Sequence, residues 1–185
     1  MTTLIVLGGL PATGKSTIAS AVALRTGAVY LRVDRIEQAV VEWTSLDHPV
    51  GPVGYAIAHE LAREQLILGL DVIVECVNPA AATRDPWLDT AAGAGASIVE
   101  IELRCSDRLE HERRVATRAS DVPGLAKPTW SQIRGRDYEP WSRPRLEIDT
   151  ATTSVAVALQ LVLDQLASTT NPRDQPRSSD SAASP

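Results

Sequence analysis

The chain has 185 residues, of which 44% are hydrophobic and 22% are charged, as in ordinary globular proteins. That length suits one α/β domain with a substantial core. The net charge of -5 gives no overall attraction to nucleic-acid phosphates, so a nucleic-acid partner is disfavoured. Residues 1–10 lack the basic flank of a signal peptide, and no apolar run is long enough to span a bilayer, so we expect a cytoplasmic protein without a membrane partner.

Short β-branched runs alternate with longer helical patterns along the chain. The runs predict strands at residues 3–7, 28–33, 71–77, 97–103 and 145–148. Helices are predicted at residues 15–26, 34–43, 53–68, 79–92 and 154–166, and a charged helix capped by Ser106 is predicted to run to about residue 119. Because such an alternation forms right-handed crossovers, the sequence predicts a three-layer α/β fold, with helices on both faces of a five-stranded parallel sheet.

The composition changes at residue 168, where Ser, Thr, Pro, Asp and Arg replace nearly all apolar residues. Ordering such a segment costs conformational entropy without burying apolar surface. We therefore predict one domain over residues 1–167 and a disordered tail over residues 168–185.

The sequence holds two cysteines, Cys76 and Cys105. Each lies near the end of an apolar run, and the two lack the close spacing of a metal or redox motif. They are expected to be buried free thiols, and the lack of a disulfide framework also favours the cytoplasm.

A glycine-containing loop follows the first predicted strand and opens the first predicted helix. Its sequence, Gly9-Leu-Pro-Ala-Thr-Gly-Lys-Ser16, matches the Walker A pattern in the position that this pattern requires. The backbone N–H groups of such a loop surround nucleotide phosphates, Lys15 reaches the β and γ phosphates, and Ser16 offers a hydroxyl to Mg2+. The predicted cofactors are ATP and Mg2+, and the predicted nucleotide-binding residues are Gly9, Ala12, Thr13, Gly14, Lys15, Ser16 and Thr17.

The Walker A loop alone does not separate kinases from GTPases, AAA+ motors or nucleotide sensors. The chain has no Asn-Lys-x-Asp guanine motif, and no apolar strand ends in the Asp-Glu pair of a motor ATPase. The chain is also too short for a motor's lid domain. GTPases and motors are therefore disfavoured.

The second predicted strand delivers Asp34 at its carboxyl end, the edge of an open α/β sheet at which ligands bind. A carboxylate there can accept the proton of an attacking hydroxyl during phosphoryl transfer. The alternative is that Asp34 only caps the following helix. The residues alone leave both roles open.

Several segments follow the Walker A loop in order: Val33-Asp34-Arg35, Val72-Ile-Val-Glu75, Arg114-Val-Ala-Thr-Arg118 and Glu139-Pro-Trp141. With them, residues 3–167 resemble the small P-loop kinases with a polynucleotide-kinase-like or zeta-toxin-like domain, often classed as AAA-type ATPases. The resemblance implies that Asp34 is the general base toward the acceptor hydroxyl. One departure concerns the acceptor, because polynucleotide kinases favour Asp-x-x-Arg, whereas this chain has Glu37 at that position and its arginine at Arg35.

Glu75 closes the third predicted strand, which is otherwise apolar. Burying an unpaired carboxylate costs several kcal/mol, so a functional role is favoured over a structural one. Glu75 and Ser16 are therefore the predicted metal site, although proteins of the resembling group often carry Asp where this chain has Glu75.

The charged helix after Ser106 places Arg114 and Arg118 four residues apart on one face. Guanidinium groups bind phosphate oxygens in a fork, so a helical lid at about residues 106–140 would bring both arginines over ATP. The alternative is a solvated helix in which Glu110 pairs with Arg113 or Arg114. The order of the segments favours the lid.

The acceptor is expected near Asp34, since loops at this sheet edge commonly choose the substrate. His48 and Tyr55 lie in or beside a loop rich in Pro and Gly, and Arg84 follows the third strand. His48 can equally be a bystander, and Arg84 can equally form a surface salt bridge. The predicted substrate-binding residues are Asp34, Arg35, His48, Tyr55 and Arg84.

Together these features predict an ATP-dependent kinase, a monomer or homodimer, that phosphorylates a hydroxyl of a small molecule such as a nucleoside, a sugar derivative or an antibiotic. Its predicted catalytic residues are Lys15, Asp34, Arg114 and Arg118. The alternatives are a polynucleotide 5'-hydroxyl kinase, a nucleoside monophosphate kinase and, in another class, a non-catalytic ATP-binding switch.

Overall fold

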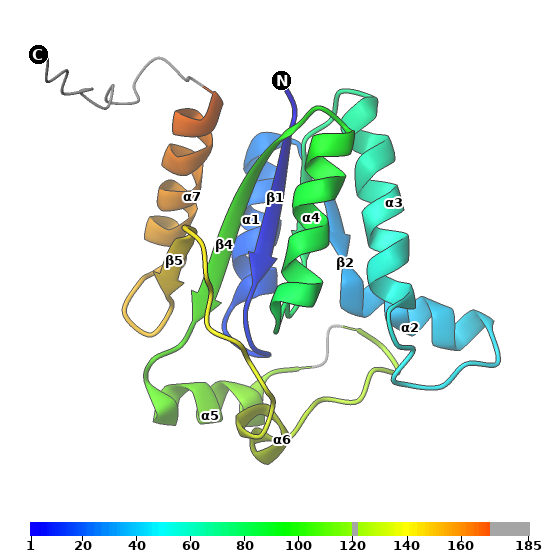
Figure 1. Cartoon of the computed structure of the whole chain (residues 1–185). Coiled ribbons are helices and arrows are strands. Elements are labelled where there is room, and N and C mark those ends of the chain that lie inside the picture. Colours follow the sequence, from blue (N-terminus) through cyan, green and yellow to red (C-terminus); the bar gives the residue numbers. More distant parts are fainter. Residues whose placement is uncertain (120–121, 171–185) are drawn as a thin grey trace, which may run out of the picture.

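The computed structural model describes residues 1–119 and 122–170. Five strands form one parallel sheet in the order β2-β3-β1-β4-β5 (Figure 1). The predicted fold class is confirmed, and every predicted strand is present, with bounds that differ from the prediction by two residues at most. The strands are β1 (Thr3–Gly8), β2 (Val29–Arg32), β3 (Val72–Glu75), β4 (Ser97–Arg104) and β5 (Leu146–Asp149).

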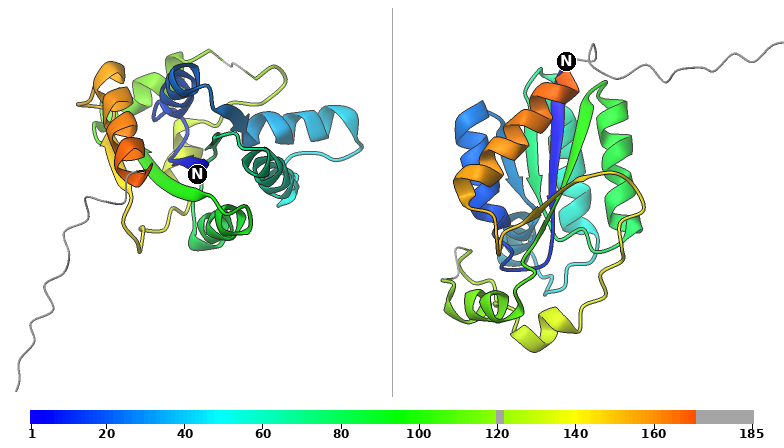
Figure 2. Two further views of the ribbon diagram at one scale, coloured as in Figure 1. Left: turned by 90° about the horizontal axis from the view of Figure 1, so that it is seen from above. Right: turned by 90° about the vertical axis from the view of Figure 1, so that its left-hand side faces the viewer.

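Two pairs of helices cover the two faces of the sheet (Figures 1 and 2). One face is covered by α1 (Lys15–Thr26) and α7 (Val155–Thr170), the other by α3 (Val53–Ile67) and α4 (Ala81–Gly93). Successive side chains of β1 alternate between the two cores: Ile5 and Leu7 pack on the α1 and α7 side, Leu4 and Val6 on the α3 and α4 side. A strand buried on both faces has to be apolar throughout, which is why this run was recognisable in the sequence.

Three further helices, α2 (Val33–Trp43), α5 (Arg108–Thr117) and α6 (Trp130–Arg134), lie toward the carboxyl ends of the strands. Figure 1 shows α5 and α6 beyond the arrowheads of the sheet. The sequence reasoning did not predict α6. Its signal was present, because Thr129 and Gln132 form a capping box in which Thr129 Oγ1 accepts from Gln132 N at 3.3 Å and Thr129 N donates to Gln132 Oε1 at 2.8 Å.

The prediction that Ser106 caps the charged helix is wrong. Asp107 is the cap of α5, and its Oδ1 accepts from the backbone N of Leu109 at 2.9 Å and of Glu110 at 3.1 Å. The carboxylate one residue later reaches two free amides of the first turn, whereas the Ser106 backbone N donates to Asp149 Oδ1 at 3.0 Å. Helix α5 is thereby fixed next to the end of β5.

The predicted start of the disordered tail is also wrong. Helix α7 continues to Thr170, three residues into the segment predicted to be disordered. The hydroxyls of Ser168 and Thr169 donate to the carbonyl of Gln165 at 2.8 and 2.9 Å, which satisfies an acceptor in the last turn. The rest of the predicted tail, residues 171–185, lies outside the described residues.

The chain returns from α6 to β5 along α4 and across the sheet (Figure 2, right). Arg143 pairs with Glu100, and Arg145 pairs with Glu102, both on β4. These ion pairs fix the segment between α6 and β5 to β4, the strand next to β5 in the sheet. The end of the predicted lid is therefore attached to the main body of the fold.

Candidate active site

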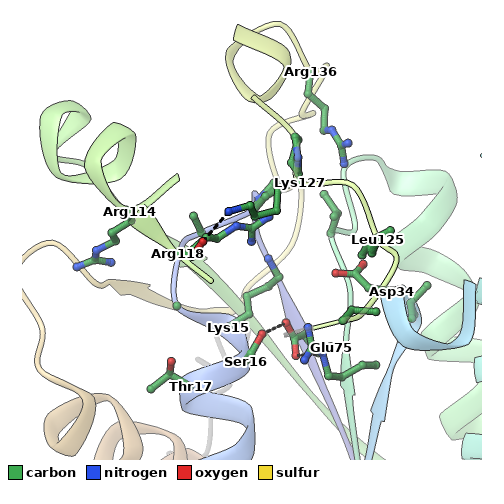
Figure 3. A pocket seen from close by; sticks show the side chains of 18 of the residues that line it. Lys15, Ser16, Thr17, Asp34, Glu75, Arg114, Arg118, Leu125, Lys127 and Arg136 are labelled. Atoms are coloured by element: carbon green, nitrogen blue, oxygen red, sulfur yellow. Dashed lines mark hydrogen bonds and ion pairs between the residues drawn. The ribbon is translucent and has the colours of Figure 1, made fainter. Parts of the chain in front are cut away.

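A cavity of about 1380 Å³ lies at the carboxyl edge of the sheet (Figure 3). The Walker A loop, the start of α2 and the start of α3 line it, and described residues between 114 and 136 cover it. The predicted residues Gly9, Thr13, Arg35 and Arg84 are not in its lining. The predicted residues that line it are Ala12, Gly14, Lys15, Ser16, Thr17, Asp34, His48, Tyr55, Glu75, Arg114 and Arg118.

The Walker A loop has backbone geometry that only glycine allows at two places. Gly9 has φ +142°, and a Cβ there would lie 2.2 Å from the carbonyl oxygen of Leu103. Gly14, with φ +92°, is the left-handed residue before α1. The first-turn amides of α1 have no partner within the helix and lie beside the cavity, the arrangement that binds phosphate. The loop therefore fits the phosphate groups of a nucleotide.

Lys15 lies across this loop. Its Nζ donates to the carbonyl oxygens of Gly9 at 2.8 Å and Leu10 at 2.9 Å, and the side chain is buried. Burial lowers the pKa of Lys15, and the opposing effects of the Glu75 and Asp34 charges place both carboxylates within electrostatic reach of the ammonium. The Walker A lysine and the two predicted carboxylates therefore belong to one site.

Glu75 is buried, at 5% exposed, and it is fully engaged. Ser16 Oγ donates to its Oε1 at 2.6 Å, Tyr30 donates its hydroxyl hydrogen to Oε2, and Arg32 Nε lies 3.2 Å from the same oxygen. The strand β2 thus holds the carboxylate beside the Ser16 hydroxyl. These two oxygen groups are the kind of ligand, direct or through water, that Mg2+ prefers.

Asp34 is the second residue of α2, and Arg32 is the residue that caps this helix. The alternative that Asp34 serves as the N-cap is therefore excluded. Its carboxylate is directed into the cavity opposite Lys15 and Ser16 (Figure 3). A negative charge in the first turn also suits the positive end of the helix dipole.

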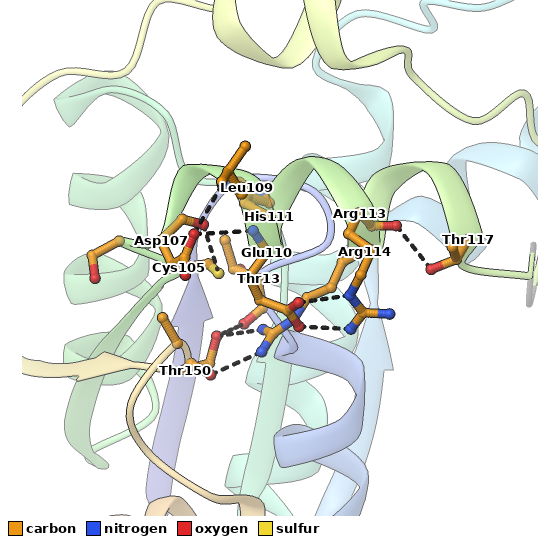
Figure 4. A network of polar contacts seen from close by, with 12 residues as sticks. Thr13, Cys105, Asp107, Leu109, Glu110, His111, Arg113, Arg114, Thr117 and Thr150 are labelled. Carbon is orange, nitrogen blue, oxygen red and sulfur yellow. Dashed lines mark hydrogen bonds and ion pairs between the residues drawn. The ribbon is translucent and has the colours of Figure 1, made fainter.

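Arg114 joins α5 to the nucleotide side of the cavity (Figure 4). It donates from Nε to Glu110 Oε1 at 2.7 Å, from Nη1 to Thr150 Oγ1 at 2.8 Å and from Nη2 to Thr150 O at 2.9 Å. Thr150 Oγ1 in turn donates to the Thr13 carbonyl at 2.9 Å. Glu110 also accepts from Arg113, and these hydrogen bonds lower the pKa of Glu110 to about 2.

Arg118 is not a residue of α5, contrary to the prediction, but the residue that caps its end, where its backbone N still donates to the Arg114 carbonyl at 3.0 Å. Helix α5 ends at Thr117, and Arg118 has extended backbone angles, φ -60° and ψ 136°. The Arg118 carbonyl accepts from Lys127 Nζ at 2.9 Å instead of continuing the helix. Figure 3 shows Arg118 near Lys15, and Arg114 farther from Lys15 on the other side of Arg118.

Two positive charges lie together where phosphate is expected. The charge of Arg118 adds to the lowering of the Lys15 pKa, so the two cations are close to each other. Arg118 Nε is buried and, among the described residues, has no hydrogen-bond partner. A bound anion would satisfy this donor and relieve the repulsion between the cations.

His48 and Tyr55 also line the cavity. His48 Nε2 is 3.1 Å from Gln38 Oε1, and the Tyr55 hydroxyl accepts from the backbone N of Asn78 at 3.1 Å. Burial raises the pKa of Tyr55, which keeps this hydroxyl neutral. Both side chains are thus held in place by hydrogen bonds next to a space that a second substrate can enter.

Arg84 and Arg35 lie outside this space. Arg35 is exposed on α2. Arg84 is buried, at 2% exposed, so it forms neither the predicted acceptor contact nor a surface salt bridge. Its guanidinium lies 4.4 Å from the Trp141 ring centroid and donates to the carbonyl oxygens of Asn78, Pro79, Glu139 and Pro140.

The sequence reasoning missed several lining or supporting residues. Tyr30 and Arg32 are two residues apart on β2, so their side chains lie on the same face of the strand. A pair of polar side chains on one face of a short strand is a signal of a functional face. Thr150 and Arg136 follow a strand and a helix without any recognisable motif. They reach the cavity through long-range folding, which no local pattern reports.

Both cysteines are free and buried, as predicted. Burial raises the pKa of the Cys76 thiol and of the Cys105 thiol, so neither is a ready thiolate. None of the described helices is long and apolar enough to cross a membrane.

Comparisons with known proteins agree with this geometry. A family model described as an AAA domain matches residues 4–133. No curated protein matches the chain. Similar solved structures include a gluconokinase from Sinorhizobium meliloti 1021 with a TM-score of 0.64 and 19% identity, which covers 89% of this chain and 91% of that chain.

Two other solved structures have the same fold. A sugar kinase from Janibacter sp. HTCC2649 has a TM-score of 0.64 and 16% identity, with 90% of this chain and 95% of that chain covered. The APS kinase of Mycobacterium tuberculosis, solved with AMPPNP and APS, has a TM-score of 0.61 and 20% identity, with 90% and 98% covered. At such identities the similarity establishes a shared P-loop kinase fold.

Proposed function

The chain belongs to this AAA-domain family, and from that premise we propose that it is an ATP-dependent kinase that transfers the γ-phosphoryl group of ATP to a hydroxyl of a small molecule. The observation that carries the proposal is the position of Asp34. Its carboxylate shares one cavity with Lys15 and Ser16, and its charge acts on the Lys15 ammonium. A switch that only binds nucleotide has no need for a free carboxylate at this place.

Asp34 acts as the general base in this proposal. It accepts the proton of the acceptor hydroxyl while the hydroxyl oxygen forms a bond to the γ phosphorus. The bond between the γ phosphorus and the bridging oxygen breaks, and ADP leaves with the bonding electrons. Phosphoryl transfer requires little more than this positioning and the neutralisation of charge.

The cations of the nucleotide side supply that neutralisation. Lys15 and Arg118 bind oxygens of the transferred group, and Arg114 holds α5 and Thr150 beside the nucleotide. Within residues 1–119 and 122–170, no cluster of three or more metal-ligating side chains could hold a metal alone. We assign the metal site to Ser16 and Glu75 together with phosphate oxygens; a bound Mg2+ would neutralise charge on the nucleotide phosphates.

Tyr30 and Arg32 have positioning roles in the proposal. They fix Glu75 from β2, so its carboxylate stays beside the Ser16 hydroxyl. A carboxylate held by three partners loses little entropy when it binds a metal-bound water.

The test combines an acceptor panel with one matched pair of variants. Purified protein is incubated with labelled ATP and nucleosides, nucleotides, sugars, antibiotics or 5'-hydroxyl oligonucleotides, and labelled products are separated. Asp34→Asn is expected to keep ATP affinity within about twofold and to lower transfer by roughly 10²- to 10⁴-fold, the usual contribution of a general base. The control is Asp47→Asn, an exposed aspartate outside the cavity lining.

Two outcomes would contradict the proposal. Unchanged turnover of Asp34→Asn would remove the base assignment. ATP binding without transfer to any acceptor class would favour the non-catalytic switch.

A further inference from the structure

The part of the cavity beyond Asp34, here called the acceptor half, has its own charge pattern. Its lining includes Glu37, His48, Val50, Tyr55 and Arg136. These residues come from α2, from the loop before α3, from α3 and from the chain after α6. The acceptor half is therefore built from side chains that meet only in the folded protein.

Glu37 lies one helical turn after Asp34 in α2, so the two carboxylates share a face of the helix. The Glu37 side chain passes directly over the first turn of α3. A Cβ at Gly54 would lie 2.3 Å from Glu37 Cγ and 3.0 Å from its Oε1. Glycine at position 54 thus leaves the space that the Glu37 side chain occupies at the cavity wall.

The two carboxylates affect each other. Burial and the charge of Asp34 raise the pKa of Glu37 to about 7, and Arg136 opposes this effect. The acceptor half therefore holds two acidic groups against one guanidinium. Figure 3 shows Arg136 reaching down toward the cavity from the chain after α6.

The other cations of the cavity have different partners. Arg32 pairs with Glu75, and Lys15 and Lys127 donate to backbone carbonyl oxygens. Arg114 is held by Glu110 and Thr150. Arg118 lies on the Lys15 side of the cavity (Figure 3). Among the described lining residues, Arg136 is thus the cation whose charge acts on Glu37.

Resting on the proposed function, we infer that Glu37 determines acceptor specificity: the acceptor half takes an uncharged or amine-bearing hydroxyl compound and excludes compounds that carry a phosphate or carboxylate near the reacting hydroxyl. An anionic group there meets Glu37 and Asp34 before it can pair with Arg136. An amine, in contrast, gains a carboxylate partner. Nucleosides and amino sugars are therefore favoured over nucleoside monophosphates and sugar phosphates.

The experiment uses matched acceptors that differ by one anionic group. Adenosine, cytidine, guanosine and uridine are each compared with their 3'-monophosphates, which keep the 5'-hydroxyl, and glucose and glucosamine with their 1-phosphates, which keep the 6-hydroxyl. At pH 8, above the pKa of about 7 of Glu37, ADP release gives kcat/KM for each, and calorimetry in the presence of a non-hydrolysable ATP analogue gives binding without turnover. Wild type is expected to favour the phosphate-free member of a used pair by at least about tenfold, since like charges at contact distance repel strongly.

Two variants should shift this ratio in opposite directions. Glu37→Gln, which keeps the shape, should reduce the preference by about tenfold or more, and Arg136→Ala should increase it. A merely structural role would move both acceptors of a pair together. The control is Glu42→Gln, because Glu42 lies on the same helix, accepts from Gln38 Nε2 at 3.1 Å and is outside the cavity lining.

The outcomes separate this inference from the proposed function. Turnover with a ratio that is unchanged in Glu37→Gln, or a wild-type preference for anionic acceptors, would overturn the inference and leave the kinase proposal standing. Selective binding of phosphate-free acceptors without turnover would overturn the kinase proposal and support the inference. Neither binding nor turnover with any pair would overturn both.

Discussion

The two halves of the cavity are built by different means. The nucleotide half is mostly backbone: Gly9 and Gly14 set the loop, and Thr150 and His111 hold the carbonyls of Thr13 and Pro11, at 2.9 and 2.8 Å. The acceptor half is made of side chains from two helices and two connecting segments, and the charges of Glu37 and Arg136 act on each other. Binding in the nucleotide half therefore depends on backbone geometry. Binding in the acceptor half depends on side-chain charge, which a substitution can alter.

The largest effect should come from Gly9→Ala, which tests the geometric half. The new Cβ would lie 2.2 Å from the Leu103 carbonyl oxygen, so the loop has to move. Because displaced contacts of this size are costly, nucleotide affinity should fall on the order of 100-fold or more, measured by calorimetry with an ATP analogue.

The control for that experiment is Gly95→Ala. Gly95 also has a positive φ, +64°, but nothing lies within 4 Å of its Cβ position. Gly95→Ala therefore measures the effect of an unfavourable backbone angle alone, without a steric clash of the new Cβ. Equal nucleotide affinity in wild type and a folded Gly9→Ala variant would break the comparison between the two halves.

A smaller effect is expected at the metal site. Glu75→Gln removes a charge that Ser16, Tyr30 and Arg32 surround, so transfer should fall roughly 10- to 100-fold and require more Mg2+. Tyr30→Phe should cause a weaker change in the same direction. The measurement is the initial rate over a Mg2+ titration, with Glu60→Gln, an exposed glutamate that pairs with Arg63, as control. A rate curve for Glu75→Gln that overlies wild type would exclude Glu75 from the metal site.

The smallest effect concerns stability and sharpens the view that charge governs the acceptor half. The folded pKa of Glu37, about 7, is above the ordinary 4.5, so the folded state binds the proton more tightly. This contribution to stability is complete below pH 4.5 and is lost as pH rises through 7. Since Glu37 is only partly buried, the loss should be about 1–2 kcal/mol.

Urea unfolding at pH 5 and pH 8 measures this loss. The drop in unfolding free energy should be smaller in Glu37→Gln by that amount and unchanged in Glu42→Gln. An identical pH dependence in wild type and Glu37→Gln would show that the pKa of Glu37 is not raised in the folded protein.

The sequence was most informative where local chemistry decides the structure. The Walker A loop could be predicted because its glycines, Lys15 and Ser16 act through backbone angles and spacing within eight residues. The strands could be predicted because burial on both faces requires continuous apolar runs. Asp34 could be placed because a residue that follows a parallel strand must reach the ligand edge of the sheet.

The remaining features depend on contacts between distant residues. Arg84 follows a strand on the correct edge, but carbonyls of residues 139 and 140 bind it from the far end of the chain. Arg118 was assigned to a helical face by its spacing from Arg114, and the helix ends one residue before it. Nothing in the sequence indicates that position 54 must lack a side chain so that the Glu37 side chain has room.

The hydrogen bonds from Arg84 to backbone carbonyls have a consequence for the engineering of this protein. Arg84 binds the main chain at residues 139 and 140 from inside α4. At its other end the predicted lid contacts the Walker A loop directly through His111 and indirectly through Arg114, which binds Thr150. The cover of the cavity is thus rooted in the body of the fold at both ends. The predicted lid therefore cannot be replaced as one segment by that of a relative. New acceptor preferences have to be introduced by single substitutions that leave the backbone unchanged.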